Sequence, residues 1–269
     1  MRFKDLLQEV SVPSVESLSA ENFADIYAKA WYKNWKREVK RLGDDYSKVK
    51  DISYLFDQLE NEVHAAAIQS GHVGFLYECL KNGRITTKLA SGQSGFENTG
   101  KREPEVEFRG EKCASHQGGC YYNALDFMNK TERDDVELAY GLMIGERFLD
   151  GVYKSIESSL DSNNSNLNTG LTEHSFVLVN GNKIFDPTLP HSELKNETYA
   201  YEIVPSSVWR KFPHDYDDKN YSANEFADYI EVELENHVGS AEIKERIQKL
   251  HEKNELRRTP PLNSILGRT

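Results

Sequence analysis

The amino-acid sequence predicts an α+β fold in which helices at both ends of the chain flank an antiparallel sheet. Near each end, apolar residues recur at three- and four-residue steps, which is the spacing of an amphipathic helix. In the middle, two apolar stretches flank Asn180-Gly181-Asn182, and an Asn-Gly step between such stretches is typical of a β-hairpin. The absence of a repeat with a period of about 20 to 50 residues argues against solenoids and propellers.

The chain of 269 residues is long enough to bury a sizeable core, and changes of composition divide it into segments. We expect an amino-terminal tail or targeting peptide (1–18), a helical layer (19–83), a central core (84–222), carboxyl-terminal helices (223–257) and a tail (258–269). Proline and serine near both ends favour the assignment of these ends as tails.

Two helical patterns make up the helical layer. Ser19 is the expected N-cap of the first pattern, which stops at Gly43, and the second pattern covers 46–67. Five basic residues gather between 33 and 41, and we interpret them as the solvated face of the first helix because the chain as a whole is acidic.

The central core is predicted to begin with loops and edge strands over 84–118, where glycines and charges accumulate. Its regular elements should be a helix over 120–129, an apolar stretch at 136–144, a helix through Phe148 and Tyr153, the hairpin over 174–188 and an extended piece at 199–204, with a flexible loop at 158–170. Two more helices are expected at 223–237 and 240–257. The second has only a narrow apolar stripe, so it is expected to pack lightly or not at all.

Charge and hydropathy argue against two classes of partner. With 44 acidic and 33 basic side chains the net charge is −11, and a field of that sign repels phosphate backbones, which disfavours nucleic acid. No apolar run approaches the ~18 residues of a membrane span, so no membrane partner is expected. The three cysteines cannot all pair and no secretory signal precedes them, so we expect reduced thiols in a cytoplasm.

Cys120 is the first candidate for chemistry. Gly118 and Gly119 permit a tight turn before it, and Cys120 then opens the helix over 120–129. A thiol at a helix N-terminus feels the positive end of the peptide dipoles, which favours the nucleophilic thiolate. The alternative is a buried structural cysteine, because free cysteine is among the most buried residue types.

His174 and Asp186 are candidates for the base and its orienter, which a thiol nucleophile requires. With a two-residue turn, Asp186 would lie opposite Ser175 and point away from His174. With a three-residue turn over 180–182, Asp186 would lie opposite Phe176 on the face of His174. Catalysis requires the second register, with Gly181 or Asn182 at positive φ. A surface histidine and an ordinary turn carboxylate are the alternatives.

A metal site is a further alternative, since Cys113, His116 and Cys120 lie within eight residues and could be joined by Cys79 or His174. Their spacing is not one of the familiar zinc-ligand patterns. We therefore expect no metal and no cofactor.

Four stretches carry a resemblance to a known family: CYYNAL from Cys120, ELAYG at 137–141, EHSFVLVNGNKIFDPTL at 173–189 and YAYEI at 199–203. Together they resemble the transglutaminase-like and papain-like cysteine enzymes, particularly the small phage and bacterial versions. The resemblance covers 113–205 and implies a thiol-enzyme core, with the cysteine helix packed on an antiparallel sheet. It also implies Cys120 as nucleophile, His174 as general base and later acid, and Asp186 as orienter.

The expected activity is that of a cysteine hydrolase or acyltransferase: a protease, an amidase or deamidase, or a transglutaminase-type enzyme acting on a protein or peptide. Gln117 and Tyr121 are the candidate oxyanion or substrate-binding residues, although Tyr121 stands where transglutaminases usually have tryptophan. Two alternatives remain: a non-catalytic protein-binding module of the same fold, and an arylamine-type acyltransferase, which often has a Gly-Gly-x-Cys start.

The first ten residues, MRFKDLLQEV, resemble the capsid-targeting peptides of internal head proteins in large tailed bacteriophages. In those proteins a protease cuts after a Leu/Ile-x-Glu triplet, and Leu7-Gln8-Glu9 fits it. The resemblance implies a mature chain beginning at Val10, located in the virion and then in the host cytoplasm.

Overall fold

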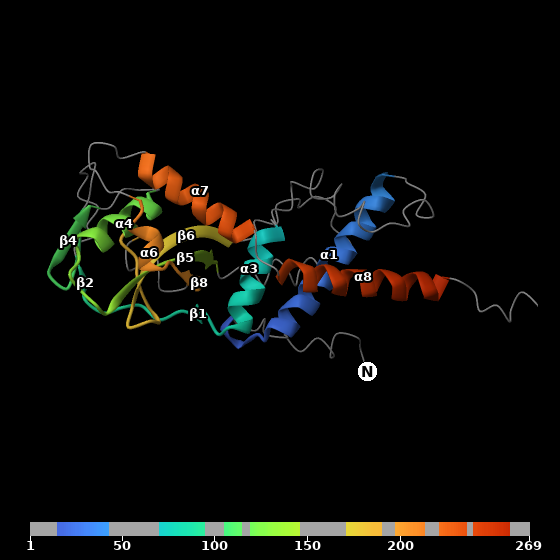
Figure 1. Ribbon diagram of the computed structural model, residues 1–269. Coiled ribbons are helices and arrows are strands. Elements are labelled where there is room, and N and C mark those ends of the chain that lie inside the picture. The colour runs from blue at the N-terminus through green and yellow to red at the C-terminus, as the bar shows by residue number, and fades with distance from the viewer. Residues whose placement is uncertain are drawn as a thin grey trace, which may run out of the picture.

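The structure is a computed structural model that describes residues 15–42, 70–94, 105–114, 119–145, 171–189, 197–212, 221–235 and 239–258. Helices and antiparallel strands are mixed along the chain, so the predicted α+β class is confirmed (Figure 1). The elements are η2 (Val15–Ser17), α1 (Ala20–Leu42), α3 (Ser70–Lys81), β1 (Ile85–Thr86), β2 (Gln93–Ser94), β3 (Glu105–Phe108), β4 (Glu111–Ala114), α4 (Cys120–Lys130), β5 (Val136–Ile144), β6 (Leu171–Val179), β7 (Lys183–Phe185), β8 (Thr198–Ile203), α6 (Ser206–Trp209), α7 (Tyr221–Glu235) and α8 (Gly239–Arg258).

The strands form two antiparallel sheets. The larger has five strands in the order β1-β8-β5-β6-β7, and the smaller has three in the order β2-β3-β4. Strand β4 lies within the region 84–118, where loops and edge strands were expected. It forms because Arg109 and Gly110 adopt positive φ values of 51° and 93°, which turns β3 back on itself.

The two faces of the five-stranded sheet carry different parts of the core. Side chains alternate between faces along a strand, and one set packs under α3, α4 and α7 in a single large cluster that includes Leu138, Val177 and Ala200. The other face carries a smaller cluster built from Phe176, Leu178, Ile184, Tyr199, Tyr201 and Ala139. His174 lies on this second face, because it is two residues before Phe176 on β6.

Helices α1, α3 and α8 pack together at the end of the molecule away from the small sheet (Figure 1). The predicted N-cap of α1 is confirmed, since the Asn22 N–H donates to Ser19 Oγ at 3.2 Å. The expectation that the last helix packs lightly is wrong. Ile243 and Ile247 of α8 are buried, and α8 contacts both α1 and α3. A narrow apolar stripe is therefore enough to pack this helix against its neighbours.

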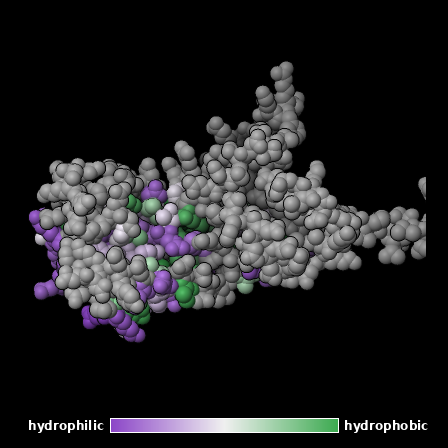
Figure 2. Space-filling model, turned by 90° about the horizontal axis from the view of Figure 1, so that it is seen from above, coloured by the Kyte–Doolittle hydropathy of each residue, from purple (hydrophilic) through white to green (hydrophobic). Residues whose placement is uncertain are grey.

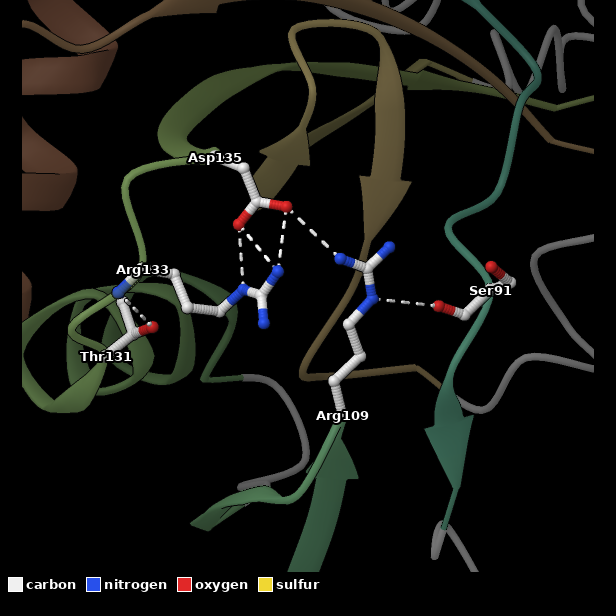
Figure 3. A network of polar contacts seen from close by, with 5 residues as sticks. All are labelled: Ser91, Arg109, Thr131, Arg133 and Asp135. Atoms are coloured by element: carbon white, nitrogen blue, oxygen red, sulfur yellow. Dashed lines mark hydrogen bonds and ion pairs between the residues drawn. The ribbon is translucent and has the colours of Figure 1, made fainter.

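An arginine network ties the small sheet to the large one (Figure 3). Asp135, which precedes β5, accepts hydrogen bonds from the Nε and Nη2 of Arg133 at 2.8 Å each and from Arg109 Nη1 at 3.1 Å. Arg109 Nε donates to the Ser91 carbonyl. Because Arg109 directly follows β3, these contacts hold β3 against the loop between α4 and β5.

Several predictions lie outside the described residues: the triplet at Leu7 to Glu9, the helical pattern over 46–67, the candidates His116 and Gln117, the helix through Phe148 and Tyr153, and the loop at 158–170.

The exposed surface of the described residues is mixed. In Figure 2 hydrophobic and hydrophilic residues are interspersed over the part of the visible face that is coloured. Ile203 and Val232 are the large hydrophobic residues with substantial exposure in the described ranges, at 39% and 53%. None of the described helices combines the length and the hydrophobicity of a membrane span.

Candidate active site

Cys120 occupies the first helical position of α4, as the two preceding glycines predicted. Gly119 is the N-cap with φ −101° and ψ 43°, and no side chain caps this end of the helix. The Asn123 N–H donates to the Gly119 carbonyl at 2.8 Å, which closes the first turn. The Cys120 N–H therefore belongs to the group of helix-start donors that have no acceptor within their own helix.

An aromatic trio anchors α4 beside β7, the strand that directly precedes Asp186. Phe127 of α4 meets Phe185 of β7 edge to face at 4.8 Å between ring centroids, and Phe108 of β3 stacks on Phe185 at 4.3 Å. All three rings are at most 1% exposed. Since Phe185 directly precedes Asp186, this packing places the carboxylate relative to the cysteine helix.

The hairpin adopts the register that catalysis requires. Val177 pairs with Phe185, Leu178 with Ile184 and Val179 with Lys183, which puts the turn at 180–182 and Asp186 opposite Phe176. Of the two registers that the sequence leaves open, the hairpin thus adopts the one with the three-residue turn. Gly181 has positive φ (74°), but the second left-handed residue is Asn180 (51°) and not Asn182. Asparagine tolerates this conformation better than most residues.

His174 and Asp186 form a buried pair across this hairpin. His174 Nε2 lies 2.6 Å from Asp186 Oδ2, and the two residues are 5% and 0% exposed. The second carboxylate oxygen, Oδ1, accepts the N–H groups of Thr188 at 2.7 Å and Leu189 at 3.2 Å. Both oxygens are therefore held, and the carboxylate orients the ring.

The His174 imidazole also interacts with Cys120, and both Asp186 and Cys120 raise the pKa of His174. Burial of His174 opposes protonation, but the charge of Asp186, the hydrogen bond to Asp186 and a hydrogen bond with Cys120 together raise the pKa of His174 to about 10. Because Nε2 faces Asp186, Nδ1 is the ring nitrogen left for the sulfur. The three predicted residues therefore converge with the imidazole in the middle.

The contacts of the Tyr121 side chain place its hydroxyl away from the His174 imidazole. Its hydroxyl donates to Glu173 Oε2 at 3.4 Å and its ring packs edge to face on Phe226. Glu173 and His174 are neighbours on β6 and face opposite sides of the sheet. The Tyr121 hydroxyl thus lies on the other side of β6 from the imidazole, which gives no support to an oxyanion role.

A second histidine–carboxylate pair, which sequence reasoning missed, lies on that other side. His72 Nε2 of α3 is 2.5 Å from Glu173 Oε1, and this hydrogen bond lowers the pKa of Glu173. The pair joins α3 to β6 beside the candidate site. Only tertiary structure brings the two residues together, because they are 101 positions apart.

The described ranges include only part of the metal alternative, because His116 and the Cys113 side chain lie outside them. No three of their histidine, cysteine, aspartate and glutamate side chains gather as a metal-binding group. Cys79, one of the proposed ligands, is buried in α3, and its S–H donates to the Tyr201 carbonyl at 3.5 Å. Burial raises the pKa of the Cys79 thiol, so it is an inert counterpart to Cys120.

Comparisons of this chain with protein-family models, with curated proteins and with solved structures found no match.

Proposed function

We propose that the chain is a cysteine enzyme that acts on an amide or other acyl substrate through Cys120, His174 and Asp186. The observation that carries the proposal is the position of the His174 imidazole, which is hydrogen-bonded with Cys120 and lies 2.6 Å from Asp186. A thiol nucleophile needs a base within reach and an orienter for that base, and this arrangement supplies both.

In the proposed reaction the Cys120 sulfur attacks the acyl carbon while its proton rests on His174. A sulfur–carbon bond forms, the carbonyl electron pair moves to oxygen, and the Cys120 N–H at the start of α4 is placed to donate to that oxyanion. The carbon–nitrogen bond then breaks as His174 returns the proton to the leaving amine. Water or a second amine, deprotonated by His174, releases the acyl group from the sulfur.

The order of elements supports a transglutaminase-like or papain-like core. The resemblance implies a helix that begins at the cysteine, a strand that carries the histidine and an aspartate on the next strand. Here the helix is α4, the strand is β6, and Asp186 directly follows β7. The substrate expected from it is a protein or peptide. Hydrolysis and transfer share the same acyl-enzyme, so both reactions are included in the proposal.

Thiol reactivity is the direct test, since it needs no substrate. We expect iodoacetamide at pH 7 to alkylate Cys120 at least about tenfold faster than Cys79, because His174 supports the thiolate whereas Cys79 is buried in an apolar environment. Peptide mapping by mass spectrometry follows each cysteine separately. The His174→Gln variant should slow alkylation of Cys120 and leave that of Cys79 unchanged.

Equal and slow labelling of the two thiols would contradict the proposal and favour a non-catalytic binding module. If Cys120 is reactive, peptide, glutamine and acyl-thioester substrates can be profiled with wild type beside Cys120→Ser. We expect the variant to lose about a thousandfold or more in turnover on any true substrate.

A further inference from the structure

Asn123 is a buried polar residue of α4 that the proposed reaction does not use. It is 0% exposed and lies three positions after Cys120, close to one helical turn away. Its side-chain Nδ2 donates to Thr188 Oγ1 at 3.0 Å. Burying an amide costs desolvation free energy, which a hydrogen bond must offset. The residue to which Asn123 donates therefore indicates what Asn123 does in the fold.

Thr188 links this amide to the carboxylate of the candidate site. The Thr188 N–H donates to Asp186 Oδ1 at 2.7 Å, while Asp186 Oδ2 faces His174. Thr188 is 5% exposed, so this connection is shielded from solvent.

These contacts close a ring. It runs from Cys120 to His174, from His174 to Asp186, from Asp186 to Thr188, from Thr188 to Asn123, and back to Cys120 along one turn of α4. The helix that carries the sulfur is thereby joined to the turn that carries the carboxylate by a route independent of the imidazole. This second connection fixes the separation of Cys120 and Asp186, which the His174 imidazole spans.

We propose that Asn123 is a positioning residue which, through Thr188, holds Asp186 in register with Cys120. The inference rests on the proposed function, because it assigns Asn123 a task only if the three side chains act as a unit. Asn123 acts on the thiol through Thr188, Asp186 and His174, and touches no reacting atom.

A double-mutant cycle isolates the contact. Asn123→Leu removes the amide at similar volume, and Thr188→Val removes the hydroxyl while keeping the N–H that Asp186 accepts. We expect each variant to slow iodoacetamide alkylation of Cys120 at pH 7 by about five- to tenfold, and the double variant to be no slower than either, because both break the same link. Thr188→Ser, which keeps the hydroxyl, should restore the rate to near that of wild type.

Ser175→Ala is the matched control. Ser175 is also buried, neighbours His174 on β6 and donates from Oγ to the Ala139 carbonyl at 3.0 Å, but it lies outside the ring. The urea midpoint of each variant is measured beside its alkylation rate. Ser175→Ala should lower the midpoint and leave the rate of Cys120 unchanged, whereas Asn123→Leu should change the rate in protein that remains folded.

The outcomes separate the two proposals. Slow alkylation of wild-type Cys120 would overturn the proposed function itself. A reactive wild-type thiol with an unchanged rate in folded Asn123→Leu or Thr188→Val would overturn only the positioning role. Additive losses in the double variant would do the same, because they would show that Asn123 and Thr188 act separately. If Asn123→Leu does not fold, Thr188→Val and Thr188→Ser carry the comparison.

Discussion

At the scale of single residues, two opposing effects act on the protonation of His174. Burial disfavours the charged ring, whereas the Asp186 carboxylate at 2.6 Å favours it, and the carboxylate prevails. The pKa of His174 is raised from 6.5 to about 10 by this balance. A group whose pKa is higher in the folded state binds its proton more tightly there, so the bound proton stabilises the fold.

This shift predicts how stability depends on pH. The contribution of His174 should be present in full below about pH 6.5 and should be lost as the pH rises through about 10. We expect the free energy of unfolding of wild type minus that of His174→Gln to fall steadily over this window. Urea unfolding of both proteins at one-unit pH steps measures the difference, because titrating groups that do not contact His174 contribute equally to both. A difference that stays constant would contradict the assignment.

At the scale of elements, two glycines show how differently backbone positions can matter. Gly141 lies in β5 between His174 of β6 and Tyr201 of β8, and a Cβ added there would come within 1.9 Å of the Ala200 carbonyl oxygen. Gly181 lies in the hairpin turn with φ 74° and nothing within 4 Å of an added Cβ. The first glycine is required for space and the second only for conformation.

Alanine at these two positions should therefore have unequal effects. We expect Gly141→Ala to destabilise the protein by about 4 kcal/mol or more, because rigid backbone must move in a central strand. Gly181→Ala should cost about 1 to 2 kcal/mol, the usual penalty for a left-handed alanine. Urea unfolding followed by far-UV circular dichroism measures both. Equal losses would show that the strand spacing at Gly141 relaxes freely.

At the scale of the whole molecule, the helices from both ends share a core with the sheet. One cluster of buried side chains includes Phe23 of α1, Leu76 of α3, Phe127 of α4, Leu138 of β5, Phe226 of α7 and Ile247 of α8. Arg246 of α8 also pairs with Asp25 of α1 at 2.5 Å, although such exposed pairs contribute little. A shared core predicts that helices and sheet unfold together.

Truncation of α8 in this core tests that cooperativity. Ile247 is 1% exposed, and Ile247→Ala should lower the free energy of unfolding by about 2 to 5 kcal/mol. Val232→Ala is the control, since this side chain is 53% exposed and its loss should change stability by less than about 0.5 kcal/mol. Circular dichroism and tryptophan fluorescence should report one transition. Separate transitions would show that the helical end unfolds independently.

The sequence anticipated much of the fold and the three candidate residues, because these depended on local signals. The glycines before Cys120 marked a helix start, the Asn-Gly step marked a turn, and alternation of apolar residues marked β6. The helices expected at 223–237 and 240–257 lie within two residues of α7 and α8. Polar positions without a local pattern, such as His72, Glu173, Asn123 and Thr188, gave no comparable signal.

What the sequence alone determined was which residues could supply a sulfur, an imidazole and a carboxylate, and that a three-residue turn would place the last two on one face. Tertiary structure decided the rest: which of the two registers the hairpin adopts, that α4 sits where Cys120 meets His174, and that Asn123 reaches Thr188. The physical reason is the distance along the chain over which each kind of signal acts. Turn and helix signals act over a few neighbouring residues, whereas these contacts form between segments brought together only when the aromatic trio and the sheet bury their apolar surface.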